Sequence, residues 1–230
     1  MKYVTLPLLS LLLPGMAIGL FTACNNTPDN RANTADTVIS KTASAQGPVL
    51  REKVLTAAEQ QALQPDQVIQ LLKDGNTRFR SNEITSRDHS AMVQDATAGQ
   101  FPKAVILSCL DSRIPVEDVF DRGIGDIFVA RVAGNFVNED ILGSMEFGCK
   151  VSGAKLILVM GHEACGAIKA AIDDVKLGNV TAMLTKITPA VKASRDFQGE
   201  KTSKNDLFVE SVAMKNVTNN IEKIKASSPI

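Results

Sequence analysis

Three short apolar runs constrain the fold of this chain more than any other feature. They are "AVILSC" (104–109), "DIFVAR" (126–131) and "KLILVM" (155–160). Nearly continuous runs of this kind are typical of parallel strands that are covered on both faces, because a strand with one wet face alternates apolar and polar residues. Between the last two runs lies "NEDILGSMEFGCKVSG" (138–153), which has helical periodicity. This alternation predicts an α/β fold with a parallel central sheet flanked by helices.

Helices are also expected before and after these strands. Residues 56–82 carry apolar residues at helical spacing, Thr56 and Glu59 have the spacing of a capping box, and Pro65 divides the stretch into two helices. Residues 86–102 are expected to form a loop or a short helix. After the third strand, three more stretches are helical by periodicity, namely 163–178, 179–194 and 205–227. We expect the folded domain to extend over residues 54–230.

The N-terminus indicates an exported protein. Residues 1–24 hold one Lys and a long apolar run that is broken by Pro14 and Gly15, which is typical of a signal peptide rather than a membrane span. "FTAC" resembles the lipobox of bacterial lipoproteins, which implies lipidation at Cys24; the alternative is an ordinary signal peptide with a cysteine there by chance. Residues 25–53 are too polar to fold and predict a flexible tether. We therefore expect a periplasmic lipoprotein that touches the membrane only through its anchor.

Composition excludes two further classes of function. The chain has 25 basic and 25 acidic residues, so it carries no excess charge that would attract nucleic acid. It has no Trp, and its single Tyr lies at position 3, inside the predicted leader. A mechanism that requires a phenol or an indole in the mature protein is therefore excluded.

Two of the predicted strands end at metal-binding side chains. Cys109 ends the first apolar run, and His162 and Cys165 follow the third within "GHEACG", in a chain with only two His and four Cys. The carboxyl ends of parallel strands gather functional groups at one edge of the sheet, so these three side chains are expected to converge. Two thiolates and an imidazole suit zinc. A helix that starts at Cys165 would also favour thiolate over thiol.

The fourth position of such a site separates a structural role from a catalytic one. A structural zinc site closes it with another Cys or His, whereas a catalytic site leaves it to water. Cys149 lies in a predicted helix, where a buried apolar role is more natural, and Cys24 lies in the tail. The fourth ligand is therefore either water or Asp111. Either choice leaves a site that can open, which favours catalysis.

Three segments, in this order and spacing, resemble those of the beta-class carbonic anhydrases: "CLDSR" (109–113), "RVAGN" (131–135) and "GHEACGAIKAA" (161–171). The resemblance runs from about residue 54 to the C-terminus. It implies one zinc ion per chain on Cys109, His162 and Cys165. It also implies a dyad in which Arg113 holds Asp111 off the metal, or an inactive state in which Asp111 is the fourth ligand. The alternative for this dyad is a surface ion pair in a turn.

The resemblance implies reversible hydration of carbon dioxide to bicarbonate and a proton by zinc-bound hydroxide. Two thiolates neutralise the charge of the zinc ion, so the hydroxide form is expected under mildly alkaline conditions. Asp111 would accept a hydrogen bond from this hydroxide. Gln100 and Phe128 match pocket positions for the substrate, and Phe147 stands where a pocket tyrosine is common. The alternative for both Phe residues is ordinary core packing, and His89 is a candidate proton shuttle whose alternative is a solvated side chain.

Several alternatives remain open at this point. Relatives are dimers or multiples of dimers with active sites near the interface, and they continue beyond "SPI" (228–230) with a helix and a final strand. The resemblance thus implies that the final C-terminal strand is missing here, which would expose a sheet edge and weaken dimerisation. The same site could hydrolyse carbon disulfide or carbonyl sulfide. It could also be a zinc or redox module in which Cys109 and Cys165 form a disulfide, or an inactive tethered scaffold.

Overall fold

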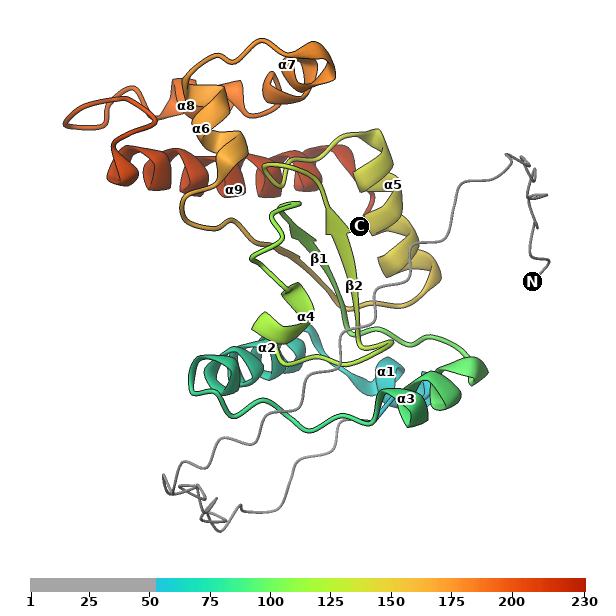
Figure 1. The fold of residues 1–230 in the computed structure, drawn as a ribbon. Coiled ribbons are helices and arrows are strands. Elements are labelled where there is room, and N and C mark those ends of the chain that lie inside the picture. The colour runs from blue at the N-terminus through green and yellow to red at the C-terminus, as the bar shows by residue number, and fades with distance from the viewer. Residues whose placement is uncertain (1–52) are drawn as a thin grey trace, which may run out of the picture. The chain divides into compact units, whose positions relative to one another are not determined.

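A computed structural model describes residues 53–230 of the chain (Figure 1). The predicted signal peptide with Cys24 lies outside the described residues, and so does the predicted tether up to residue 52. Within the described part, no helix is both long enough and apolar enough to cross a membrane.

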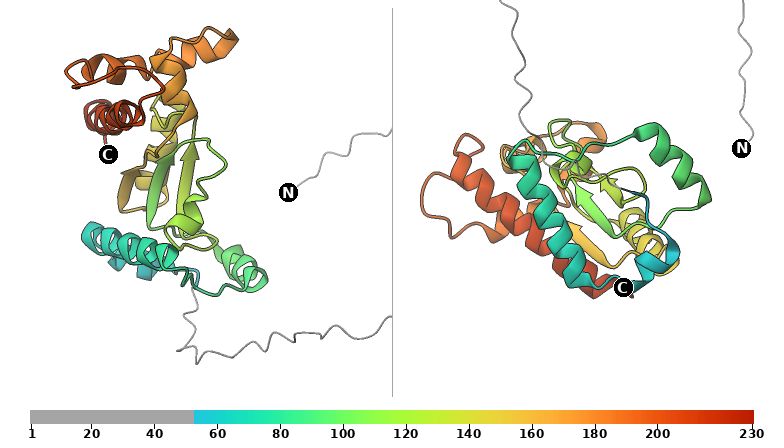
Figure 2. Two further views of the ribbon diagram at one scale, coloured as in Figure 1. Left: turned by 60° about the vertical axis from the view of Figure 1, so that its left-hand side comes forward. Right: turned by 90° about the horizontal axis from the view of Figure 1, so that it is seen from below.

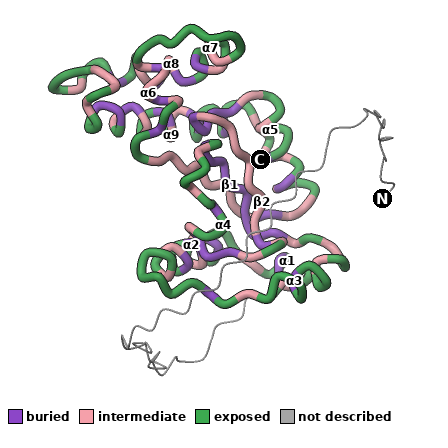
Figure 3. The backbone as a smooth tube through the Cα atoms, in the orientation of Figure 1, coloured by how far each residue is buried: buried purple, intermediate pink, exposed green. Residues whose placement is uncertain are grey.

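The three apolar runs form a parallel sheet, as the sequence predicted. Its strands are β1 (Ala104–Ser108), β2 (Ile127–Arg131) and β3 (Leu156–Val159), in the order β2-β1-β3. The register pairs Ser108 with Arg131 and Leu107 with Val159, so the carboxyl ends of all three strands lie at one edge. The central strand β1 is fully buried, whereas β2 and β3 are half-buried (Figure 3).

Alternate residues of β1 belong to two different apolar clusters. Ala104 and Ile106 pack with Val68 and Leu72 of α2 (Pro65–Arg80) and with Val116 of α4 (Val116–Val119). Val105 and Leu107 belong to the cluster on the opposite face, with Met145 of α5 (Glu139–Glu146) and Ile224 of α9 (Asp206–Ser227). Both faces of the sheet are therefore covered, which explains why the strands lack a polar alternation.

The N-terminal helices begin where the capping signals predicted. Thr56 Oγ1 accepts the Glu59 backbone N–H at 3.3 Å, and Glu59 Oε2 accepts the Thr56 N–H at 2.9 Å, which starts α1 (Ala57–Ala62). Helix α2 begins at Pro65, so the division into two helices is confirmed. The stretch 86–102 contains α3 (His89–Asp95) and the 3-10 turn η1 (Ala96–Ala98).

The helices that follow β3 gather beyond the carboxyl ends of the strands, whereas α5 packs on a face of the sheet (Figures 1 and 2). The segment 138–153 is α5 followed by one π-helical stretch, η2 (Phe147–Val151). The three later helical stretches are confirmed as α6 (Gly166–Ile172), α7 (Gly178–Leu184), α8 (Thr188–Ala193) and α9. These four helices pack around a third apolar cluster that includes Cys109 and Cys165. The two cysteines are therefore buried in this apolar cluster and do not lie on the surface.

Candidate metal centre

Three side chains from two segments of the chain meet at the carboxyl edge of the sheet. Cys109 directly follows β1, His162 lies in the loop after β3, and Cys165 is the N-cap of α6. One donor atom from each side chain lies within 4.8 Å of the others, and the two sulfur atoms, 56 residues apart in sequence, are separated by 3.8 Å. Among the described residues this is the set of three Cys, His, Asp or Glu side chains that is close enough to share an ion.

The imidazole of His162 presents one nitrogen to the two sulfurs. Its Nδ1 lies 2.8 Å from the Glu163 backbone oxygen, so Nδ1 carries the proton and Nε2 presents a lone pair. Nε2 is buried and makes no hydrogen bond to any described residue. A buried polar atom without a partner is costly, and a metal ion would satisfy it. The donor set of two sulfurs and one nitrogen therefore fits a zinc ion.

The two thiols differ in their acidity. A hydrogen bond from the Cys165 thiol lowers the pKa of Cys109, against the opposing effect of burial, and the Gly134 N–H contributes at 3.3 Å from the sulfur. The pKa of Cys165 is raised, because its thiol donates to the Cys109 thiolate and because it is buried. An ion bound by both sulfurs would displace the proton of the Cys165 thiol.

Asp111 is held by Arg113 through both carboxylate oxygens. Oδ1 accepts the Arg113 Nε–H and backbone N–H, both at 2.9 Å, and Oδ2 accepts the Nη2–H at 2.7 Å. These bonds hold the pKa of Asp111 well below its usual range and raise that of Arg113. Asp111 Oδ2 nevertheless lies 3.9 Å from His162 Nε2. The arginine therefore engages both oxygens of the carboxylate.

Arg131 and Gly134 support the site, and the sequence analysis assigned neither of them a role. Arg131, at the end of β2, donates from Nε to the Cys109 backbone oxygen at 2.9 Å and from Nη2 to the Asp111 backbone oxygen. Gly134 donates its N–H to the Cys109 sulfur. Both belong to "RVAGN", which follows a strand end, so the rule that located Cys109 also indicated this segment.

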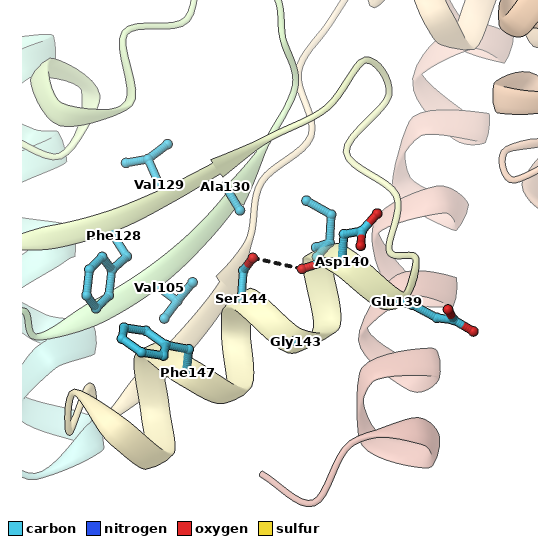
Figure 4. A pocket seen from close by; sticks show the side chains of 10 residues that line it. Val105, Phe128, Val129, Ala130, Glu139, Asp140, Gly143, Ser144 and Phe147 are labelled. Atoms are coloured by element: carbon cyan, nitrogen blue, oxygen red, sulfur yellow. Dashed lines mark hydrogen bonds between the residues drawn. The ribbon is translucent and has the colours of Figure 1, made fainter. Parts of the chain in front are cut away.

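The predicted pocket residues lie apart from the three donor atoms. Phe128 and Phe147 lie side by side at a cavity of about 700 Å³ between β2 and α5 (Figure 4), and none of the three metal-binding candidates lines it. Phe128 packs on the core, whereas Phe147 is 52% exposed, so core packing accounts for the first but not for the second. Gln100 is exposed and does not line this cavity.

A second cavity does include His162. It measures about 390 Å³ and lies between β3 and α9, with Met160, Ala213 and Val217 among its apolar lining residues and Glu163 and Glu210 as its acidic ones. His89 is exposed at the first position of α3, in keeping with the solvated alternative.

The chain belongs to the carbonic anhydrase family, beta class. A family model described as carbonic anhydrase matches residues 104–230, which include β1, the donor set and α9. The family predicted from the three segments is therefore confirmed.

The similar proteins are carbonic anhydrases from several organisms. Carbonic anhydrase 2 of Mycobacterium tuberculosis is 41% identical over 133 residues, and the carbonic anhydrase of Mycolicibacterium smegmatis is 37% identical over 130 residues. Each alignment covers 54% of this chain and 63% of the relative, so the chain spans less than two thirds of the length of these relatives.

Solved structures show the same fold. A Coccomyxa beta-carbonic anhydrase in complex with acetazolamide has a TM-score of 0.52 and 27% identity, over 61% of this chain and 67% of that one. A tetrameric beta-carbonic anhydrase of Sordaria macrospora has a TM-score of 0.54 and 21% identity, over 71% of this chain and 83% of that one. The predicted parallel sheet flanked by helices is thereby confirmed as the fold class.

Replacement of Cys165 by serine is expected to abolish zinc binding, because it removes a sulfur from a site with three protein donors. Cys149→Ser is the matched control, since Cys149 lies in η2 and outside the donor set. We expect zinc content, measured by elemental analysis of purified protein, to be near one ion per chain in the original protein and in Cys149→Ser, and close to zero in Cys165→Ser. Equal zinc in the two serine variants would contradict the site.

Proposed function

We propose that this protein is a zinc-dependent carbonic anhydrase that hydrates carbon dioxide reversibly to bicarbonate and a proton. The observation that carries the proposal is the buried, unpartnered His162 Nε2 beside two sulfurs and an arginine-held carboxylate. Cys109, His162 and Cys165 would hold the ion. A zinc ion there would supply the Lewis acidity that makes a water molecule nucleophilic, under mildly alkaline conditions because the two thiolates neutralise its charge.

Asp111 orients the attacking water in this proposal. Its carboxylate is ionised because Arg113 holds its pKa low, so it accepts hydrogen bonds and donates none. A water beside Nε2 would therefore point an O–H at Asp111 and a lone pair at the carbon of the substrate. Arg113 fixes the carboxylate with a bidentate contact, which restricts its orientation before the substrate arrives.

The alternatives make different use of the same residues. A redox module would use Cys109 and Cys165, which are free thiols at 3.8 Å, but it leaves His162 and the Asp111–Arg113 pair without a role. Hydrolysis of carbon disulfide or carbonyl sulfide would use the same donor set and the same carboxylate. Carbon dioxide is favoured because the most similar relatives described above are named carbonic anhydrases.

Asp111→Asn is expected to lower kcat/KM for carbon dioxide hydration by about 100-fold or more while zinc content stays unchanged, because an amide can offer an N–H where the water needs an acceptor. Stopped-flow hydration assays measure this effect. The control is Asp196→Asn, an exposed carboxylate far along the chain, between α8 and α9. Full turnover in Asp111→Asn would remove the proposed role. If the zinc-loaded original protein turns over only carbonyl sulfide or carbon disulfide, carbon dioxide is the wrong substrate and one of these two compounds is the right one.

We also propose that the chain forms a homodimer or a multiple of dimers through the face formed by β2 and α5. Support comes from the half-exposed Phe147 beside the large cavity and from the half-buried β2, which is an edge strand of the described sheet. The relative from Sordaria macrospora is tetrameric. Because family members have their active sites near the interface, this face would bring Phe128 and Phe147 to a substrate pocket that one copy does not complete.

Phe147→Glu is expected to shift the protein toward monomers, because it places a charge on the apolar face that a second copy would cover. Light scattering after size-exclusion chromatography reports the mass directly. Leu177→Glu is the control, since Leu177 is also exposed but lies at the start of α7. An unchanged mass for Phe147→Glu would argue against this interface.

The third proposal concerns location: the protein is exported to the periplasm and anchored through a lipid on Cys24. The support is sequence alone, namely the apolar leader and the "FTAC" segment. In a host with a periplasm we expect the original chain in the membrane fraction and Cys24→Ser in the soluble periplasmic fraction. Membrane association that survives Cys24→Ser would contradict the lipid anchor.

A further inference from the structure

Helix α9 buries two asparagines one turn apart, on the side that faces the loop after β2. Asn216 and Asn220 are 1% and 5% exposed, and on the buried face of the helix they lie between the apolar residues Val212 and Ile224. A buried amide is costly unless its donors and acceptor are satisfied, and an aliphatic residue would pack such a position at lower cost. We therefore expect these amides to hold the loop after β2 in place through hydrogen bonds.

The two amides form a short relay of hydrogen bonds to the loop. Asn220 Oδ1 accepts the Val137 N–H at 2.8 Å, while Asn220 Nδ2 donates to the Asn216 backbone oxygen at 2.8 Å and to its Oδ1 at 3.2 Å. These contacts turn the Nδ2 group of Asn216 toward the loop. There it donates to the Gly134 backbone oxygen at 2.8 Å.

Gly134 lies between this relay and the metal site. It has φ of +82°, a conformation that favours glycine, and a Cβ there would lie 2.4 Å from Ile187 Cδ1. A residue without a side chain is poorly restrained by its own sterics, so its carbonyl contact with Asn216 helps to set its orientation. The N–H of the same residue donates to the Cys109 sulfur at 3.3 Å.

We propose that Asn216 is a positioning residue for the metal centre: it keeps the Gly134 N–H on the Cys109 sulfur, with Asn220 orienting its amide, and so determines how tightly the site retains its ion. An N–H donated to a thiolate stabilises the charged ligand and fixes its direction. Loss of such an outer contact typically costs 10–100-fold in metal affinity. The consequence for the metal depends on the zinc site proposed above, whereas the hold on Gly134 does not.

The test compares Asn216→Leu with Asn219→Leu. Leucine has the same branching at Cγ as asparagine and removes the donor. Asn219 lies on the same helix, and its side chain makes no hydrogen bond to the part of the chain that the structure describes. Deuterium exchange of the segment 131–137 is measured on metal-free protein, and the rate of zinc transfer to an excess of chelator is measured on zinc-loaded protein. The absorption band from thiolate to Co²⁺ in the cobalt-substituted protein reports on the sulfur itself.

We expect Asn216→Leu to speed exchange at Gly134, to accelerate zinc transfer by about 10-fold or more and to shift the cobalt band, while Asn219→Leu changes none of the three. Unchanged exchange at Gly134 would overturn the inference whether or not zinc binds. If Asn216→Leu exchanges faster at Gly134 but its rate of zinc transfer and its cobalt band are unchanged, the proposed effect of Asn216 on the metal is wrong. An original protein that binds no zinc would refute the proposed zinc site instead, and the exchange result would still decide the role of Asn216. Should Asn216→Leu fail to fold, Asn216→Ala, which adds no bulk, is measured in the same way.

Discussion

The parallel pairing of β1 with β3 determines where every donor atom of the site lies. Leu107 pairs with Val159, so the chain leaves both strands at the same level. Cys109 comes two residues after the first of these positions, and His162 comes three residues after the second. A shift of one residue in this register would turn the side chains of β3 to the opposite face and separate the donors. The apolar contacts of β1 on both faces hold that register.

The loop after β2 supports the site from behind. Arg131 binds the backbone oxygens of Cys109 and Asp111, and Gly134 binds the Cys109 sulfur. The end of the first strand therefore provides one metal-binding candidate and the carboxylate, the end of the third provides two candidates, and the end of the second provides groups that orient them. All three strand ends take part, although only two of them carry metal-binding candidates.

The sequence predicted the functional residues that lie close to a strand end. It did not predict the residues that reach the site through packing of elements far apart in the chain. Cys109, His162 and Cys165 could be placed together because a buried parallel strand precedes each of the two segments. Asn216 gave no such signal, because its partner Gly134 is 82 residues earlier and the contact depends on how α9 packs across the sheet. Phe128 and Phe147 were assigned to a substrate pocket from the resemblance alone, and their separation from the donor set depends on geometry that motif order does not contain.

The two sulfurs are also part of the apolar core, and this links the metal to the stability of the domain. Cys109 and Cys165 belong to the cluster around which α6, α7, α8 and α9 pack. An ion bound to both would cross-link the end of β1 to the start of α6 and close a loop of more than fifty residues, which reduces the conformational entropy of the unfolded chain. Metal binding would then stabilise the packing of the helices beyond the sheet. Loss of the metal would destabilise those helices more than the rest of the fold.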